Sequence, residues 1–189
     1  EVEIIKLDSQ LGPIWGKEAP NETFVKKENV SAEEIAVIMY TSGTTGNPKG
    51  VMLSHSNLLA AGRYISSGHE VDHKDTALCV LPIYHINGLC VTVMGTLASA
   101  STLVLPDRFS VNAFWTIIET HRCTWFSAVP TQYSYILNNK SMPGKIPFLR
   151  FARSASAPLS PEIHRKFEER FKIPIIETMG LTETGSQIS

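Results

Sequence analysis

The sequence predicts an α/β fold with a mostly parallel sheet and helices on both of its faces. From residue 35 onward, short apolar runs rich in β-branched and aromatic residues alternate with segments of helical period. This alternation is the pattern of β–α units. A length of 189 residues with 43% hydrophobic content supplies one sizeable core or slightly more. We therefore expect a globular α/β segment.

The predicted elements follow one another in a regular order. The apolar runs predict strands at residues 35–40, 77–82, 102–105, 125–129, 148–154 and 174–178. The intervening segments predict helices at residues 56–67, 86–100, 111–121, 131–139 and 161–171. Ser110 offers a hydroxyl N-cap to one helix, and Ser160 precedes a proline at the first helical position of another. Residues 1–34 predict a strand followed by an irregular connection, so we assign the central α/β part to residues 35–189.

The charge balance and the cysteines narrow the class of protein. Lys and Arg number 17 against 18 Asp and Glu, so no basic stripe is available for a nucleic acid or an anionic membrane. The three cysteines have no CxxC spacing, which favours unpaired thiols in a reducing compartment, and we expect a cytoplasmic protein. Apolar runs are much shorter than the roughly 20 residues of a membrane helix.

A loop rich in glycine and threonine follows the first predicted strand. Residues 40–50 read Tyr-Thr-Ser-Gly-Thr-Thr-Gly-Asn-Pro-Lys-Gly. Glycines let successive N–H groups converge on an anion, hydroxyls add donors, and the lysine adds positive charge, so the loop suits a polyphosphate. The spacing does not match the Walker A pattern, which disfavours an ordinary P-loop NTPase. A Gly/Thr-rich turn without a ligand is the alternative interpretation.

Residues 40–51 resemble the signature phosphate loop of the adenylate-forming, or AMP-binding, superfamily. Its members include acyl-CoA synthetases, peptide-synthetase adenylation domains and beetle luciferases, and the loop holds the β- and γ-phosphates of ATP. By resemblance, binding of this cofactor is expected from Thr41, Ser42, Gly43, Thr44, Thr45, Gly46 and Lys49.

Two further segments resemble that family in the family's own order. Residues 81–88 resemble a Pro-x-aromatic-His-x-x-Gly element that lines the acyl pocket of CoA ligases, which implies a catalytic role for His85. A lone histidine at a strand end is more often structural, and its place in this element reverses that expectation. Residues 154–159 resemble one wall of the adenine site, which implies contacts from Ser156, Ala157 and Pro158.

A fourth segment, residues 177–183, resembles the family's adenine and magnesium segment. The resemblance implies adenine contacts from Glu177, Thr178, Met179 and Gly180. It also implies that Thr182 contacts the α-phosphate and that Glu183 binds Mg²⁺, a catalytic pair. Met179 departs from the family, where most members have Tyr or Phe, and its sulfur contact with a ring replaces part of the stacking.

The resemblance implies ATP-dependent activation of a carboxylic acid to an acyl-adenylate, followed by transfer to a thiol, usually CoA. No acidic residue lies beside His85 to pair with an α-ammonium group, so an acyl or aryl acid is favoured over an amino acid. The resemblance covers the middle of a family enzyme, the central part of its large N-terminal domain. From this resemblance we expect that residues 1–189 do not include the C-terminal lid domain with its lysine, and that this fragment alone does not turn over.

Three alternatives stay open. A non-catalytic nucleotide-binding module would carry the same ATP segments, because fold does not fix function. An amino-acid or carrier-protein adenylation domain would differ mainly in substrate. Residues 69–73 satisfy HExxH, the zinc-protease pattern, but the glycine before them and the charged residues around them predict a helix-ending loop rather than a zinc site.

Overall fold

The computed structural model describes residues 6–8, 12–14, 30–41 and 47–188. Within residues 1–34 it describes two short strands, β1 (Lys6–Asp8) and β2 (Gly12–Ile14), which pair antiparallel. In the described part of the chain, no helix combines the length and apolarity that crossing a membrane requires.

A five-stranded sheet forms the centre of the fold, and all of its strand pairs are parallel. The strand order is β6-β5-β7-β8-β9. The strands are β5 (Thr76–Cys79), β6 (Thr102–Val104), β7 (Trp125–Ala128), β8 (Phe151–Ser154) and β9 (Ile175–Glu177). The predicted α/β class and the mostly parallel sheet are confirmed.

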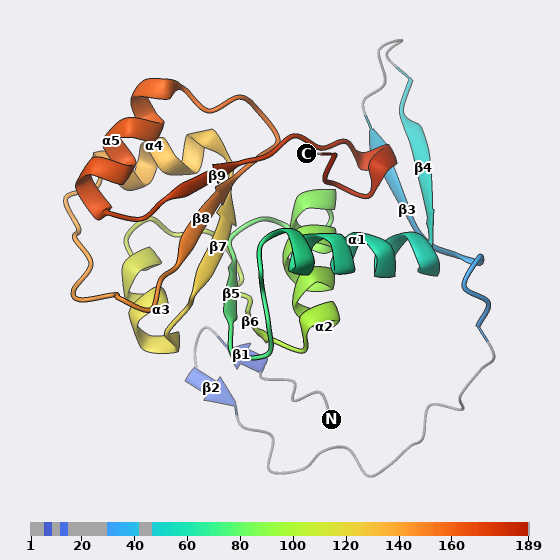
Figure 1. The fold of residues 1–189 in the computed structure, drawn as a ribbon, viewed down its shortest axis with the longest axis horizontal. Coiled ribbons are helices and arrows are strands. Elements are labelled where there is room, and N and C mark those ends of the chain that lie inside the picture. Colours follow the sequence, from blue (N-terminus) through green and yellow to red (C-terminus); the bar gives the residue numbers. More distant parts are fainter. Residues whose placement is uncertain (1–5, 9–11, 15–29, 42–46, 189) are drawn as a thin grey trace.

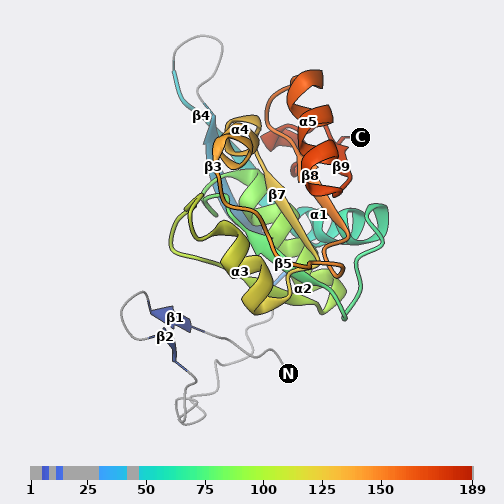
Figure 2. The ribbon, with the colours of Figure 1, turned by 90° about the vertical axis from the view of Figure 1, so that its left-hand side faces the viewer.

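Helices cover both faces of this sheet, as predicted (Figure 1). One face carries α1 (His55–Gly68), the π-helix η1 (Asn87–Met94) and α2 (Gly95–Ser99). The other carries α3 (Phe114–His121), α4 (Pro130–Asn138) and α5 (Pro161–Phe171), and Figure 2 looks onto that face.

Side chains that alternate along the strands contribute to two separate hydrophobic cores, one on each face of the sheet. Trp125 of β7 packs with Ile65 of α1, whereas the next residue, Phe126, packs with Phe114 and Phe167 of the opposite helices. Successive strand side chains point to opposite faces, so a strand that is covered by helices on both faces is apolar at most of its positions rather than at every second one. Ser127 of β7 and Arg153 and Ser154 of β8 are buried polar exceptions.

The first predicted strand does not join the parallel sheet. It forms β3 (Ile35–Thr41), which pairs antiparallel with β4 (Lys49–Ser54), a strand that the sequence pattern does not predict. The expectation that residues 35–40 open a β–α unit was therefore wrong. Only three apolar residues separate the loop from the next helix, and such a short run gains its strand character from pairing across the hairpin.

One face of this hairpin is buried. Met39 and Leu53 are buried, and Leu53 packs with Leu58 of α1. Helix α1 begins directly after β4 with a capping box: the Ser54 hydroxyl accepts from the Asn57 backbone N–H at 3.3 Å, and the Asn57 side chain accepts from the Ser54 N–H at 3.0 Å. The cap fixes the hairpin against the helix.

Two helix starts test the sequence signals. Ser160 is the N-cap position of α5 and Pro161 opens that helix, as predicted. The N-cap of α3 is Ala113, so the prediction for Ser110 was wrong. The Ser110 hydroxyl instead accepts from the Ala113 N–H at 3.4 Å and closes the turn before the helix.

Candidate functional site

The strand order places a switch point at the carboxyl ends of β5 and β7. The chain passes from β5 to β6 on one side and then returns to β7 on the other side of β5. In open α/β sheets, ligands bind outside the carboxyl ends of the strands at such a point. The segments after β5, β8 and β9, all singled out by the sequence, therefore lie along this edge.

The segment after β5 holds His85 in an exposed position. The His85 N–H donates to the Pro82 carbonyl at 3.1 Å, and its ring lies 4.7 Å from that of Tyr84. The π-helix η1 starts two residues later. A Cβ at Gly88 would overlap the Pro82 carbonyl oxygen, so glycine is required for the helix to begin this close to the turn.

The segments after β8 and β9 are joined to the first one by hydrogen bonds. Ser156 has a left-handed backbone with φ of 74°, and its hydroxyl oxygen accepts from the Asn87 side-chain amide at 3.2 Å. The Thr178 N–H donates to the Ser154 carbonyl at 3.0 Å. Glu177 accepts from the Leu159 N–H at 3.3 Å, so its carboxylate also orders the strip that carries Ala157 and Pro158.

A tight turn after β9 presents the Thr182–Glu183 pair. A Cβ at Gly180 would overlap the Ser186 carbonyl oxygen, so the chain can fold back here only through glycine. The Ile188 N–H donates to the Met179 carbonyl at 2.8 Å and closes the turn. Within it lies a short 3₁₀ helix, η2 (Thr182–Thr184). Met179 and Glu183 are exposed.

The 3₁₀ helix lies beside β4, which brings the segment predicted to bind magnesium to the hairpin that carries the predicted phosphate loop. Thr41 and Lys49 face each other at the end of this hairpin, and Lys49 is exposed. The other residues predicted for phosphate binding, Ser42, Gly43, Thr44, Thr45 and Gly46, lie outside the described residues.

The donor set fits a magnesium ion held mainly by nucleotide oxygens. Among the described residues, no group of three or more His, Cys, Asp or Glu side chains is placed to hold a metal. Glu183 is therefore a single carboxylate on an exposed turn. Mg²⁺ usually binds through one or two carboxylates together with substrate phosphates and water, which is compatible with this arrangement.

A buried polar cluster lies directly inside this edge, and the sequence interpretation missed it. Arg153 of β8 is fully buried. Its Nη1 donates to Asn87 Oδ1 at 3.1 Å and to Ser127 Oγ at 3.3 Å, and its Nη2 donates to Gln187 Oε1 at 3.4 Å. The Arg153 Nε has no partner. The available signal was an arginine inside an apolar strand, because arginine is almost never fully buried without a partner.

The charge of Arg153 acts on its surroundings. Burial lowers the pKa of Arg153 to about 10, so the guanidinium stays charged at neutral pH. Burial and the positive charge of Arg153 together lower the pKa of His69 to about 4, so His69 is neutral. Within the described ranges, no carboxylate lies at ion-pair distance from Arg153.

The HExxH run does not form a zinc site. Helix α1 ends at Gly68, so the two histidines of the run do not share a helix face. His69 is buried, with its ring 5.6 Å from that of Phe151, whereas His73 is exposed. The zinc-hydrolase alternative was wrong, because the run forms the turn that leads into β5.

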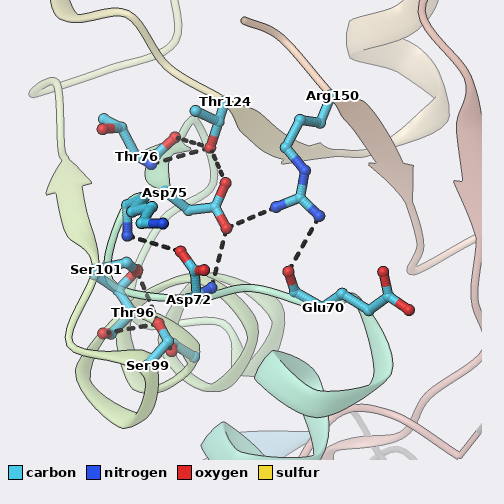
Figure 3. A network of polar contacts seen from close by, with 11 residues as sticks. Glu70, Asp72, Asp75, Thr76, Thr96, Ser99, Ser101, Thr124 and Arg150 are labelled. Atoms are coloured by element: carbon cyan, nitrogen blue, oxygen red, sulfur yellow. Dashed lines mark hydrogen bonds and ion pairs between the residues drawn. The ribbon is translucent and has the colours of Figure 1, made fainter.

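That turn belongs to a polar network at the amino ends of the strands, on the side of the sheet opposite the candidate site (Figure 3). Asp75, Thr124 and Arg150 immediately precede β5, β7 and β8. Arg150 donates to Asp75 at 2.6 Å and to the Glu70 carbonyl at 3.1 Å, and the Thr124 hydroxyl donates to Asp75 at 2.6 Å. The network ties the amino ends of three strands together.

The sequence comparisons with known proteins agree with the predicted family. The sequence model of the AMP-binding enzyme family matches residues 2–189. The chain is 51% identical over 152 residues to a sulfoacetate–CoA ligase of Cupriavidus necator, covering 80% of this chain and 30% of that protein. It is 34% identical over 158 residues to an oxalate–CoA ligase of Saccharomyces cerevisiae, covering 84% of this chain and 29% of that protein.

A solved structure has a similar fold. The O-succinylbenzoate coenzyme A synthetase of Bacillus subtilis, in complex with ATP and a magnesium ion, superposes with a TM-score of 0.75 at 31% identity, covering 84% of this chain and 33% of that one. The chain spans about 30% of the length of the two ligases above. Since the family model covers almost every residue, the chain belongs to the AMP-binding enzyme family.

Proposed function

We propose that the protein carrying this chain is an AMP-forming acid–CoA ligase. Its substrates are ATP, CoA and a carboxylic acid without an α-amino group. The observation that carries the proposal is the meeting of the predicted acyl, adenine and magnesium segments at one sheet edge, with η2 beside the phosphate-loop hairpin. The names of the two similar ligases support CoA as the thiol.

Each segment has a role in this proposal. The strip from Ser156 to Pro158 and the turn at Met179 and Gly180 hold adenine between them. Thr41, Lys49 and the loop that they flank hold the β- and γ-phosphates, and Thr182 donates to the α-phosphate. Glu183 holds Mg²⁺, which when bound neutralises charge on the phosphate oxygens.

The reaction proceeds in two displacements. A carboxylate oxygen of the acid attacks the α-phosphorus of ATP, and the bond to pyrophosphate breaks. The CoA thiol then loses its proton and attacks the acyl carbon, and AMP leaves. Two anions approach each other in the first step, so donors that hold the phosphate oxygens in place lower its barrier. His85 lies at the acyl end of this edge, where it positions the carboxylate.

The acid that we favour is small. The two similar ligases are named for sulfoacetate and oxalate, which are short and carry two acidic groups. We also propose a reducing compartment such as the cytoplasm, since all three cysteines are buried and unpaired.

Acid-dependent exchange of pyrophosphate into ATP tests the proposal. The full-length protein that contains this chain should exchange pyrophosphate only when a carboxylic acid is present, and release AMP only when CoA is added. Exchange with amino acids alone would support an adenylation domain of the peptide-synthetase kind. ATP binding without exchange for any acid would overturn the ligase proposal and leave a nucleotide-binding module.

A further inference from the structure

The guanidinium of Arg153 is a buried cation that has no counter-anion among the residues that the structure describes. All of its described partners, Asn87, Ser127 and Gln187, are neutral acceptors. A charge removed from water costs several kcal/mol unless an opposite charge or a full set of hydrogen bonds compensates. Neither is complete here, because Nε has no partner and the Nη2 contact is long.

The free part of the guanidinium is one edge. Nε and Nη2 point their hydrogens in the same direction, and this edge forms the two-pronged donor that binds a carboxylate or a sulfonate. Nη1, on the other edge, is occupied by Asn87 and Ser127. The donor pair suited to an acidic group therefore carries only the 3.4 Å contact to Gln187, a half-buried residue of the final segment.

The position of Arg153 indicates which anion is bound. The phosphates of ATP are assigned to the hairpin and to Thr182. Arg153 instead contacts Asn87, which follows His85 in the acyl segment, and Asn87 in turn contacts Ser156. The side chain of Asn87 thus lies between the guanidinium and Ser156, at the junction of the acyl segment and the strip assigned to adenine. A short acid with two acidic groups would present one of them to His85 and the other to Arg153.

We propose that Arg153 binds a second acidic group, a carboxylate or a sulfonate, of a short substrate acid through its Nε–Nη2 edge. The anion displaces the Gln187 oxygen and supplies the missing charge. Asn87 and Ser127 hold the guanidinium in place from its other edge. This inference rests on the proposed ligase function and names its substrate class.

Matched acids test this site in the full-length protein. Pyrophosphate release is measured with malonate, succinate and sulfoacetate, and with acetate, propionate and butyrate as acids of similar size that carry one acidic group. The acids with two acidic groups should have kcat/KM values higher by about 100-fold, the range expected for a buried charge-paired contact. A carboxylate–sulfonate comparison within the first set identifies the preferred group.

Variants assign the effect to Arg153. Arg153→Met should raise KM for the two-acid substrates by about 100-fold while leaving KM for ATP and turnover of acetate unchanged, and Arg153→Lys should restore part of the loss. Arg150→Met is the matched control, because this arginine lies at the opposite edge of the sheet. Equal losses for one-acid and two-acid substrates in Arg153→Met would assign Arg153 a structural role and overturn the proposal.

If Arg153→Met fails to fold, a second variant tests whether Arg153 binds the second acidic group. Gln187→Glu places a carboxylate on the same edge of Arg153, where it should compete with the second acidic group and raise KM for two-acid substrates only. An unchanged preference in Gln187→Glu would overturn the proposal. If the wild-type protein uses both sets of acids equally well, this inference fails while the ligase function stands. If no acid supports pyrophosphate release, the ligase function itself fails.

Discussion

Two arginines, one just before β8 and one within it, show how differently the two ends of the sheet are built. We call the side where the parallel strands begin the amino edge and the side where they end the carboxyl edge. Arg150 precedes β8 at the amino edge, is 40% exposed, and pairs at 2.6 Å with a buried carboxylate, Asp75. Arg153 lies near the carboxyl end of β8, is fully buried, and has only neutral acceptors among the described residues. Charge is balanced at the amino edge, which is structural, and left unbalanced at the carboxyl edge, where the ligand segments meet.

The two arginines illustrate how a stabilising ion pair differs from a candidate binding residue. Burial of Asp75 raises its pKa, but hydrogen bonds from Arg150, Thr124 and the Asp72 backbone outweigh this and hold the pKa of Asp75 below its usual range. Such a closed network needs no ligand. A buried cation without a carboxylate is the opposite case, since its environment becomes complete only when an anion arrives.

The largest effect is expected from Glu183 at the carboxyl edge. Glu183→Ala should lower acid-dependent pyrophosphate exchange by about 100-fold, because loss of one stabiliser of the phosphate charge costs on the order of 3 kcal/mol. The melting temperature should not change, since the side chain is exposed. Undiminished exchange would show that Glu183 does not bind the metal, and it would contradict the assignment of the ligand site to the carboxyl edge.

A substitution at the amino edge should change the free energy of unfolding rather than the activity. Arg150→Ala leaves Asp75 buried without its cation and should lower the free energy of unfolding by about 2 kcal/mol, the lower end for a buried pair because Arg150 is partly exposed. Denaturant unfolding measures this loss, and Arg150→Lys should recover part of it. KM values for the acid and for ATP should stay constant. A change in either value would contradict the purely structural role of the amino edge.

A moderate effect is expected at the acyl segment. His85→Ala should raise KM for the acid by about 10-fold, the loss of roughly one hydrogen bond to a charged group, while KM for ATP is unchanged. Steady-state kinetics with each substrate varied separately measure the two constants. His73→Ala, an exposed histidine near the amino edge, is the control and should change neither. An equal rise in both constants for His85→Ala would place His85 outside the acyl pocket.

The smallest effect is expected for His69, whose pKa is lowered by burial and by the positive charge of Arg153. Its pKa of about 4 in the fold lies below the ordinary 6.5, so the unfolded chain binds more protons between these values. The free energy of unfolding should therefore fall as the pH drops from 6.5 toward 4, on the order of 1 kcal/mol between pH 7 and pH 5 after solvent screening. Urea unfolding at both pH values should show a smaller fall for His69→Phe.

Local sequence pattern was enough to predict the long helices, the five parallel strands and the order of the predicted ligand segments. Periodicity and apolar runs are local properties, and they located all five parallel strands and all the long helices. Because segments 81–88, 154–159 and 177–183 each follow a strand, parallel pairing alone brings them to one edge. Element boundaries were less certain, as Ser110 illustrates, since the last turn before a helix depends on contacts outside it.

The pairing of the strands and the contacts between polar groups could not be predicted from the sequence and became known from the fold. The hairpin of β3 and β4 and the order β6-β5-β7 depend on hydrogen bonds between distant segments, about which local pattern carries no information. The same holds for the cluster at Arg153, whose partners Asn87 and Ser127 come from other elements. A side chain's partners are fixed by packing between layers, so a buried cation can be recognised as incomplete only after the layers are assembled.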